Sequence, residues 1–113
     1  MARDRLGASR VSLEAGFFSN AASAAYYAML YAARAALSEE ERNAKTHRGT
    51  WQLFRETFVD TGRFDEQLAA QARRTQPLRE ATDYDAVMVS HEDAERVVDL
   101  ADRFFSAINS VLD

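Results

Sequence analysis

Residues 90–112, SHEDAERVVDLADRFFSAINSVL, have the pattern of one amphipathic helix. Ser90 and Asp93 are three residues apart, the spacing of a capping box at a helix start. Beyond them, apolar residues recur at steps of three and four, which places them on one face. They are Ala94, Val97, Val98, Ala101, Phe104, Phe105, Ile108 and Leu112. Such a face has to pack against other elements, so this segment predicts a helical core.

The rest of the chain favours further helices. It has one proline and four glycines, and no hairpin signal or sustained strand alternation. We expect helices at about 2–15, 19–38, 47–60 and 65–81. The second has a face of small and apolar residues, and the third has an aromatic one. These residues are Ala22, Tyr26, Met29, Leu30, Ala33 and Leu37, followed by Trp51, Phe54 and Phe58.

Local signals set the ends of these helices. Gly16 predicts the C-cap of the first helix, and Ser19 or Asn20 the N-cap of the second. Gly62 is expected to end the third. Pro77 removes a backbone donor and should kink or divide the fourth. The fold prediction is an all-α, antiparallel bundle of about five helices, in a single domain over residues 1–113.

Composition narrows the function. The chain has 113 residues, of which 47% are apolar, so its core is small and a dimer is expected. The net charge of −4 argues against a protein that coats nucleic acid, and any such contact needs a local basic patch. There is no cysteine, leader or apolar segment long enough for a bilayer, so we predict a cytoplasmic protein with no membrane contact.

The sequence offers little for a metal or a cofactor. It has two histidines and no Glu-x-x-His, the motif of carboxylate-bridged metal sites in bundles. It also has no glycine-rich phosphate loop and no nucleophile elbow. We therefore predict no metal and no cofactor.

A basic cluster lies between the second and third predicted helices, in ERNAKTHRG, residues 41–49. Thr46 is the predicted N-cap of a helix that begins at His47. Backbone donors there, with Lys45 and Arg48, would suit a phosphate. The alternative is a solvated loop that balances the acidic run at residues 39–41, and the cluster alone favours this alternative.

A second cluster occurs in RRTQPLREATDYD, residues 73–85. The first two arginines are expected on an exposed helical surface. Arg79, Asp83 and Tyr84 would lie on neighbouring faces if the helix continues, with Asp83 holding a guanidinium that could bind a phosphodiester. They could equally form an ion pair that closes a helix end. The tyrosines at positions 26, 27 and 31 are interpreted as core or interface packing.

Five stretches in order carry a family resemblance: AYYAMLYAARAAL, KTHRGTWQLF, TGRFD, LREATDYD and SHEDAERVVDLADRF. Together, over residues 12–112, they resemble the HEPN superfamily, in its small stand-alone branch. The resemblance implies a helical bundle that is commonly a homodimer. It also implies either a metal-independent endoribonuclease or a non-catalytic module that binds RNA, a nucleotide or a protein partner. Small members are often the toxin of a toxin–antitoxin pair, beside a minimal nucleotidyltransferase as antitoxin.

The family's ribonucleases carry an Arg, four to six residues and then a His on a late helix. Here Arg79 fills the first position, but Tyr84 stands five residues later. Tyrosine titrates near 10 and is a poor base at neutral pH. Arg42 and His47 have a similar spacing in the wrong part of the fold, which we interpret as a chance match. The Lys45-Thr46-His47 triplet recurs in this branch.

The resulting hypothesis is a composite site. Arg79 holds the phosphate with the help of Asp83, and His47 and Tyr84 share proton transfer. Lys45 and Arg48 bind RNA. The function predicted is a toxin-type endoribonuclease, and the alternative is a non-catalytic module that uses the same cleft.

Overall fold

The computed structural model describes residues 2–84 and 89–112, and for residues 77–84 it describes the backbone alone. Within these residues there is no strand, so the predicted all-α class is confirmed. The elements are α1 (Ala2–Glu14), α2 (Phe18–Glu39), α3 (His47–Phe54), the π-helical turn η1 (Arg55–Val59), α4 (Glu66–Tyr84) and α5 (His91–Leu112).

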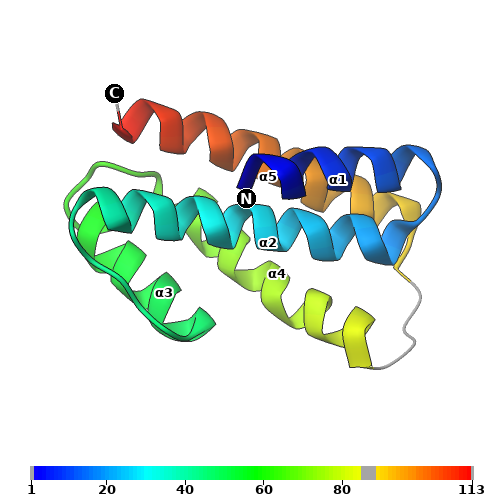
Figure 1. Ribbon diagram of the computed structural model, residues 1–113, viewed down its shortest axis with the longest axis horizontal. Helices are drawn as coiled ribbons and strands as arrows, with labels where there is room; N and C mark the ends of the chain where they lie inside the picture. The colour runs from blue at the N-terminus through cyan, green and yellow to red at the C-terminus, as the bar shows by residue number, and fades with distance from the viewer. Residues whose placement is uncertain (1, 85–88, 113) are drawn as a thin grey trace.

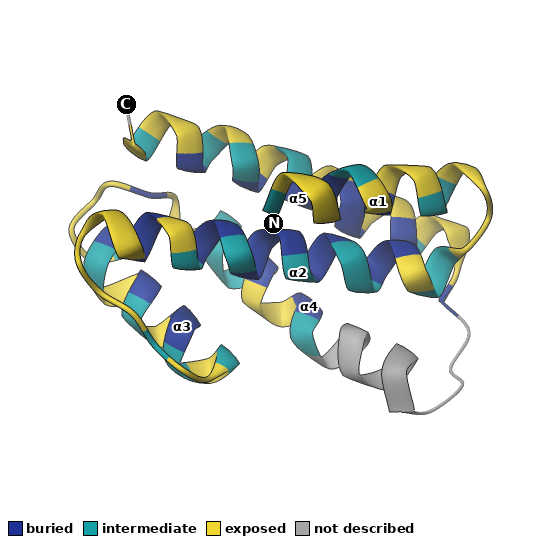
Figure 2. Cartoon of the chain, viewed as in Figure 1, coloured by how far each residue is buried: buried dark blue, intermediate teal, exposed yellow. Residues whose placement is uncertain are grey.

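Helix α2 is the centre of the fold. It contacts α1 and α5 on one side and α3 and α4 on the other (Figure 1). Because four helices surround it, α2 is buried over most of its circumference, beyond the single face that the pattern predicts (Figure 2). Seven of its alanines are buried, and their small side chains let the neighbouring helices approach closely. They are Ala21, Ala22, Ala25, Ala28, Ala32, Ala33 and Ala36.

An aromatic cluster joins α3 and η1 to α5. Trp51, Phe54 and Phe58 are buried, as predicted. The ring of Phe104 in α5 lies 5.6 Å from that of Phe54 and 5.9 Å from that of Trp51, between ring centroids. The α5 stripe is confirmed except at Leu112, which is 44% exposed because it lies in the last turn beyond the packed part of the bundle.

The turn between α1 and α2 confirms one predicted cap and corrects another. Gly16 has φ +85°, and its N–H donates to the Leu13 carbonyl while that of Phe17 donates to the Ser12 carbonyl. This is a Schellman C-cap, which needs a left-handed residue at Gly16. The Schellman turn closes at Phe17, so α2 begins at the next residue, Phe18. Its N-cap position, Phe17, has no side-chain hydrogen bond to the helix. The predicted N-cap at Ser19 or Asn20 is therefore wrong.

Two other helix ends follow their signals. Ser90 Oγ accepts the Asp93 N–H at 3.0 Å, so the N-cap of α5 is confirmed, and the Asp93 carboxylate accepts from Arg96 instead of closing a reciprocal box. Gly62 has φ +81° just after η1. Helix α4 continues through Pro77 to Tyr84, so of the two predicted outcomes, a kink or a division, the division is wrong. A proline removes one ladder donor, and packing of α4 against α2 and α5 compensates for that loss.

Candidate functional site

His47 is the first residue of α3, directly after the predicted N-cap. Thr46 has extended backbone angles, and its Oγ1 accepts the Gly49 N–H at 2.8 Å. A Cβ atom at position 49 would come within 2.8 Å of that same Oγ1. The glycine that ends the basic run therefore leaves room for the cap, and the cap fixes where the imidazole begins the helix.

The imidazole of His47 contacts a tyrosine from the core. The hydroxyl oxygen of Tyr26 in α2 lies 3.2 Å from His47 Nδ1, and it accepts a hydrogen bond from Trp51 Nε1, also at 3.2 Å. Tyr26 is fully buried and Trp51 is 4% exposed, whereas His47 is partly exposed. A rigid buried chain, Trp51 to Tyr26 to His47, therefore positions an imidazole at the protein surface.

Further aromatic side chains continue from this imidazole along α2, and a cation lies over them. The rings of Tyr27 and His47 meet edge to face at 5.9 Å, and Tyr31 follows along α2 with its ring 5.8 Å from that of Tyr27. The guanidinium of Arg5 in α1 lies 5.7 Å from the Tyr27 ring and 5.9 Å from the Tyr31 ring. These distances allow cation–π attraction.

A second arginine is tied to the start of α3. Arg34 Nε donates to Thr50 Oγ1 at 3.2 Å, and that hydroxyl donates to the Thr46 carbonyl at 2.8 Å. Lys45 and Arg48, on either side of the capped turn, are exposed. We call His47, Tyr26, Tyr27, Arg34 and Thr46 the His47 site. Its exposed surroundings are cationic and aromatic, a combination suited to phosphates and bases.

The solvated-loop alternative fits only part of the basic cluster. Arg42 Nη1 contacts Thr57 Oγ1 of η1 at 3.3 Å, and it makes no bond to His47 among the described residues. His47 is different, because core residues hold it. Tyr26 was interpreted from the sequence as packing alone, and it is buried packing that also carries this contact. The spacing of Tyr27, Tyr31 and Arg34 on one face of α2 was the available signal.

The second predicted cluster lies outside the described side chains. Arg79, Asp83 and Tyr84 fall in the last two turns of α4, where the backbone is helical. Helical backbone is the condition that their proposed arrangement required. The convergence of Arg79 on His47 stays a prediction.

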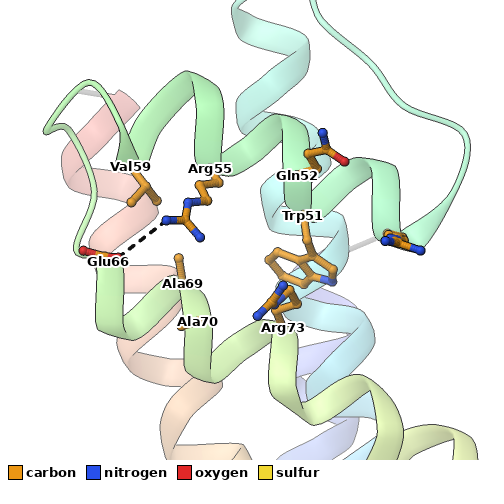
Figure 3. A pocket seen from close by; sticks show the side chains of 9 residues that line it. Trp51, Gln52, Arg55, Val59, Glu66, Ala69, Ala70 and Arg73 are labelled. Carbon is orange, nitrogen blue, oxygen red and sulfur yellow. Dashed lines mark ion pairs between the residues drawn. The ribbon is translucent and has the colours of Figure 1, made fainter.

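A pocket of about 280 Å³ opens between α3 with η1 on one side and α4 on the other (Figure 3). We call it the α3–α4 pocket. Its lining contains three arginines, one glutamate, an indole, an amide and three aliphatic residues: Arg48, Arg55, Arg73, Glu66, Trp51, Gln52, Val59, Ala69 and Ala70. Trp51 belongs to both this pocket and the hydrogen-bond chain to His47.

The described residues contain no group of three histidine, cysteine, aspartate or glutamate side chains placed to hold a metal ion. None of the described helices combines the length and the apolar character that crossing a bilayer requires.

Comparison with known proteins identifies similar chains. A family model described as the HEPN domain matches residues 1–111. The protein named "Putative toxin MJ0605", from Methanocaldococcus jannaschii, is 29% identical over 112 residues, which cover 99% of this chain and 84% of that protein. "Putative toxin MJ0142", from the same organism, is 33% identical over 95 residues, which cover 83% of this chain and 65% of that protein. A UPF0332 protein of Gloeobacter violaceus is 31% identical over 105 residues, with 91% and 83% covered.

Proposed function

The chain belongs to the HEPN family, and from that premise we propose that it is a toxin-type endoribonuclease that cleaves RNA without a metal. The family match spans nearly the whole chain, and the names of two relatives contain the word toxin. The observation that carries the proposal is the His47 imidazole, held at the surface by a buried tyrosine and preceded and followed in the chain by the exposed cations Lys45 and Arg48.

The reaction proposed is attack of a ribose 2′-hydroxyl on the adjacent phosphodiester. A base removes the proton of the 2′-hydroxyl, and an acid protonates the departing 5′-oxygen. The products are a 2′,3′-cyclic phosphate and a 5′-hydroxyl, with no other reactant consumed. His47 and Tyr84 share these proton transfers, because an imidazole titrates near neutral pH and a phenol is suited to donation only.

The remaining roles belong to cations. Arg79 holds the scissile phosphate through paired N–H donors, and Asp83 orients its guanidinium. Lys45 and Arg48 flank His47 and draw the RNA backbone toward it. Two copies of the chain pair to complete the cleft, and a minimal nucleotidyltransferase acts as antitoxin. These last two statements rest on the family alone.

The test is cleavage of a single-stranded RNA in EDTA by the parent, His47→Ala and Arg79→Ala. Loss of one positioned proton-transfer group is expected to slow cleavage by about 10²–10⁴-fold. His91→Ala is the matched control, because His91 is the other histidine of the chain and lies exposed, 3.4 Å from Glu95 in α5. Cleavage by His47→Ala at the parent's rate would refute the role of the imidazole.

A non-catalytic module is the second candidate, because Tyr84 stands where the family's ribonucleases have histidine. It predicts that the parent leaves RNA intact in EDTA while still binding it. Removing both Lys45 and Arg48 would then weaken RNA binding. The end groups of any product separate the two candidates, since only the proposed enzyme generates cyclic phosphates.

A further inference from the structure

The α3–α4 pocket has an excess of positive charge. Three arginines and one glutamate line it, a net formal charge of +2 in a chain whose net charge is −4. Arg55 is occupied, with its guanidinium 3.7 Å from Glu66 and 3.6 Å from Asp60. Arg48 and Arg73 have no hydrogen bond or ion pair to any residue that the structure describes. Two guanidiniums are therefore available to a ligand.

Most of the uncharged residues that line the pocket are apolar. The indole of Trp51 and the side chains of Val59, Ala69 and Ala70 supply apolar surface (Figure 3). The Gln52 amide donates to Glu56 Oε1 at 3.4 Å, and its oxygen can accept. Trp51 cannot swing away to make room, because its ring packs against Phe54 and Phe104 and its N–H is bonded to Tyr26. The pocket is therefore preformed, with a rigid aromatic wall.

Charge and size together specify a ligand class. A phosphomonoester carries about −1.5 to −2 charges at pH 7, which matches the two available guanidiniums better than a phosphodiester with one charge. An apolar wall with a hydrogen-bonding amide suits a nucleobase and its sugar. A volume of about 280 Å³ is at the low end for ligand sites, and it has room for one nucleotide but not for a longer segment.

We propose that the α3–α4 pocket binds the phosphomonoester of a single nucleotide, either free or at the end of an RNA chain, through Arg73 and Arg48 with Trp51 as its wall. This site is distinct from the proposed cleavage centre. Nucleotide binding at the pocket does not depend on RNA cleavage, although Arg48 belongs to both proposed sites.

Trp51 makes the test direct. It is the only tryptophan in the chain, so the tryptophan emission comes from a side chain that lines this pocket, and the variants below separate the pocket from the His47 site. The probes are AMP, adenosine, inorganic phosphate, and an RNA tetramer with 2′-O-methyl groups that prevent its cleavage, made with a 5′-phosphate and with a 5′-hydroxyl. We expect AMP to change the fluorescence and to bind at least tenfold more tightly than adenosine. Binding is measured in parallel by calorimetry.

Arg73 and Arg74 provide a matched pair of variants. Both are exposed, adjacent in α4 and alike in charge, but Arg74 lines a different cleft, between α4 and α5. Arg73→Ala should weaken AMP binding by about tenfold or more, as expected for losing one charge-assisted contact. Arg74→Ala should change it less than twofold. Equal losses in the two variants, or no calorimetric binding of AMP at millimolar concentration, would overturn the proposal.

The RNA arms identify the source of the phosphate. If the 5′-phosphate tetramer binds at least tenfold more tightly than the 5′-hydroxyl tetramer, the pocket reads RNA ends. If only AMP binds, it is a mononucleotide site. Both results support the proposal. If inorganic phosphate binds as tightly as AMP, the nucleoside contributes nothing to the affinity and the proposal is refuted.

The same measurements separate this inference from the proposed function. His47→Ala should slow cleavage by about 10²–10⁴-fold and leave AMP binding within twofold of the parent. Loss of AMP binding in Arg73→Ala is likewise measured without any cleavage. An intact cleavage activity with no AMP binding would refute the pocket alone, and AMP binding without cleavage would refute the nuclease alone.

Discussion

Replacing Tyr26 by phenylalanine removes one oxygen atom from the centre of the His47 site. That oxygen accepts from Trp51 Nε1 and lies 3.2 Å from His47 Nδ1. Because Trp51 is 4% exposed, its N–H would be left with little access to water. An unsatisfied buried donor costs about 1–3 kcal/mol. For a domain of this size, at about 4 °C per kcal/mol, the melting temperature should fall by about 4–12 °C.

The assay is thermal and urea unfolding followed by circular dichroism, with Tyr31→Phe as the matched control. Tyr31 lies on the same helix and is partly buried, and its hydroxyl makes no hydrogen bond among the described residues. Its loss should therefore change stability by less than about 0.5 kcal/mol. If the two variants unfold at the same midpoint, the hydroxyl of Tyr26 contributes nothing and the hydrogen-bond chain is wrong.

A second readout addresses the imidazole itself. The nitrogen chemical shifts of His47 report which ring nitrogen carries the proton, and Tyr26 constrains that choice through Nδ1. Tyr26→Phe should change the tautomer distribution of His47 and leave that of His91 as it was. His91 is a suitable internal reference because it lies at the start of α5 and pairs with Glu95. Unaltered His47 shifts would show that Tyr26 only fills space.

Substitutions at three further positions probe the scaffold. Thr46→Ala should lower the free energy of unfolding in urea by about 1 kcal/mol, since Thr46 Oγ1 caps α3 by accepting the Gly49 N–H at 2.8 Å. Thr46→Ser keeps a hydroxyl at this position and should retain most of that stability. Glu41→Gly should raise the free energy of unfolding by about 0.5–1 kcal/mol, because Glu41 has φ +58° directly after Glu40, the C-cap of α2; a fall would contradict this backbone strain. Phe104→Ala should cost about 3–5 kcal/mol, because its fully buried ring joins α5 to α3; a cost near 1 kcal/mol would mean that the aromatic cluster repacks.

The helices were predictable because their signals are local. The stripe of α5 and the aromatic face at Trp51, Phe54 and Phe58 depend on three- and four-residue spacing, which the backbone imposes wherever the helix packs. The errors occurred where a longer context decides. The start of α2 is set by the preceding Schellman turn at Gly16, and the exposure of Leu112 by where the bundle ends. The π-helical turn at residues 55–59 had no sequence signal.

The candidate site likewise combines features that local sequence predicts with features that only the packing of the helices creates. The cap at Thr46 and the cationic setting of His47 follow from neighbouring residues and were expected. The contact with Tyr26 joins residues 21 apart, and it exists only because α3 crosses α2 at this point. No periodicity encodes such a crossing. The α3–α4 pocket is likewise a product of packing, since it brings the exposed Arg73 of α4 into the same lining as Arg48 of α3.

Trp51 explains why the scaffold and the site cannot be separated in this protein. One face of its indole is part of the aromatic core with Phe54 and Phe104, its N–H supports the hydroxyl that holds His47, and its ring lines the α3–α4 pocket. A change at Trp51 would therefore alter stability, imidazole position and pocket shape together. A variant at Arg73 changes the pocket alone, because its exposed guanidinium bonds to no residue that the structure describes. A variant at Tyr26 changes stability and the imidazole, and leaves the charges of the pocket as they are. Experiments that assign function here should therefore begin with those two residues and use the indole as the reporter.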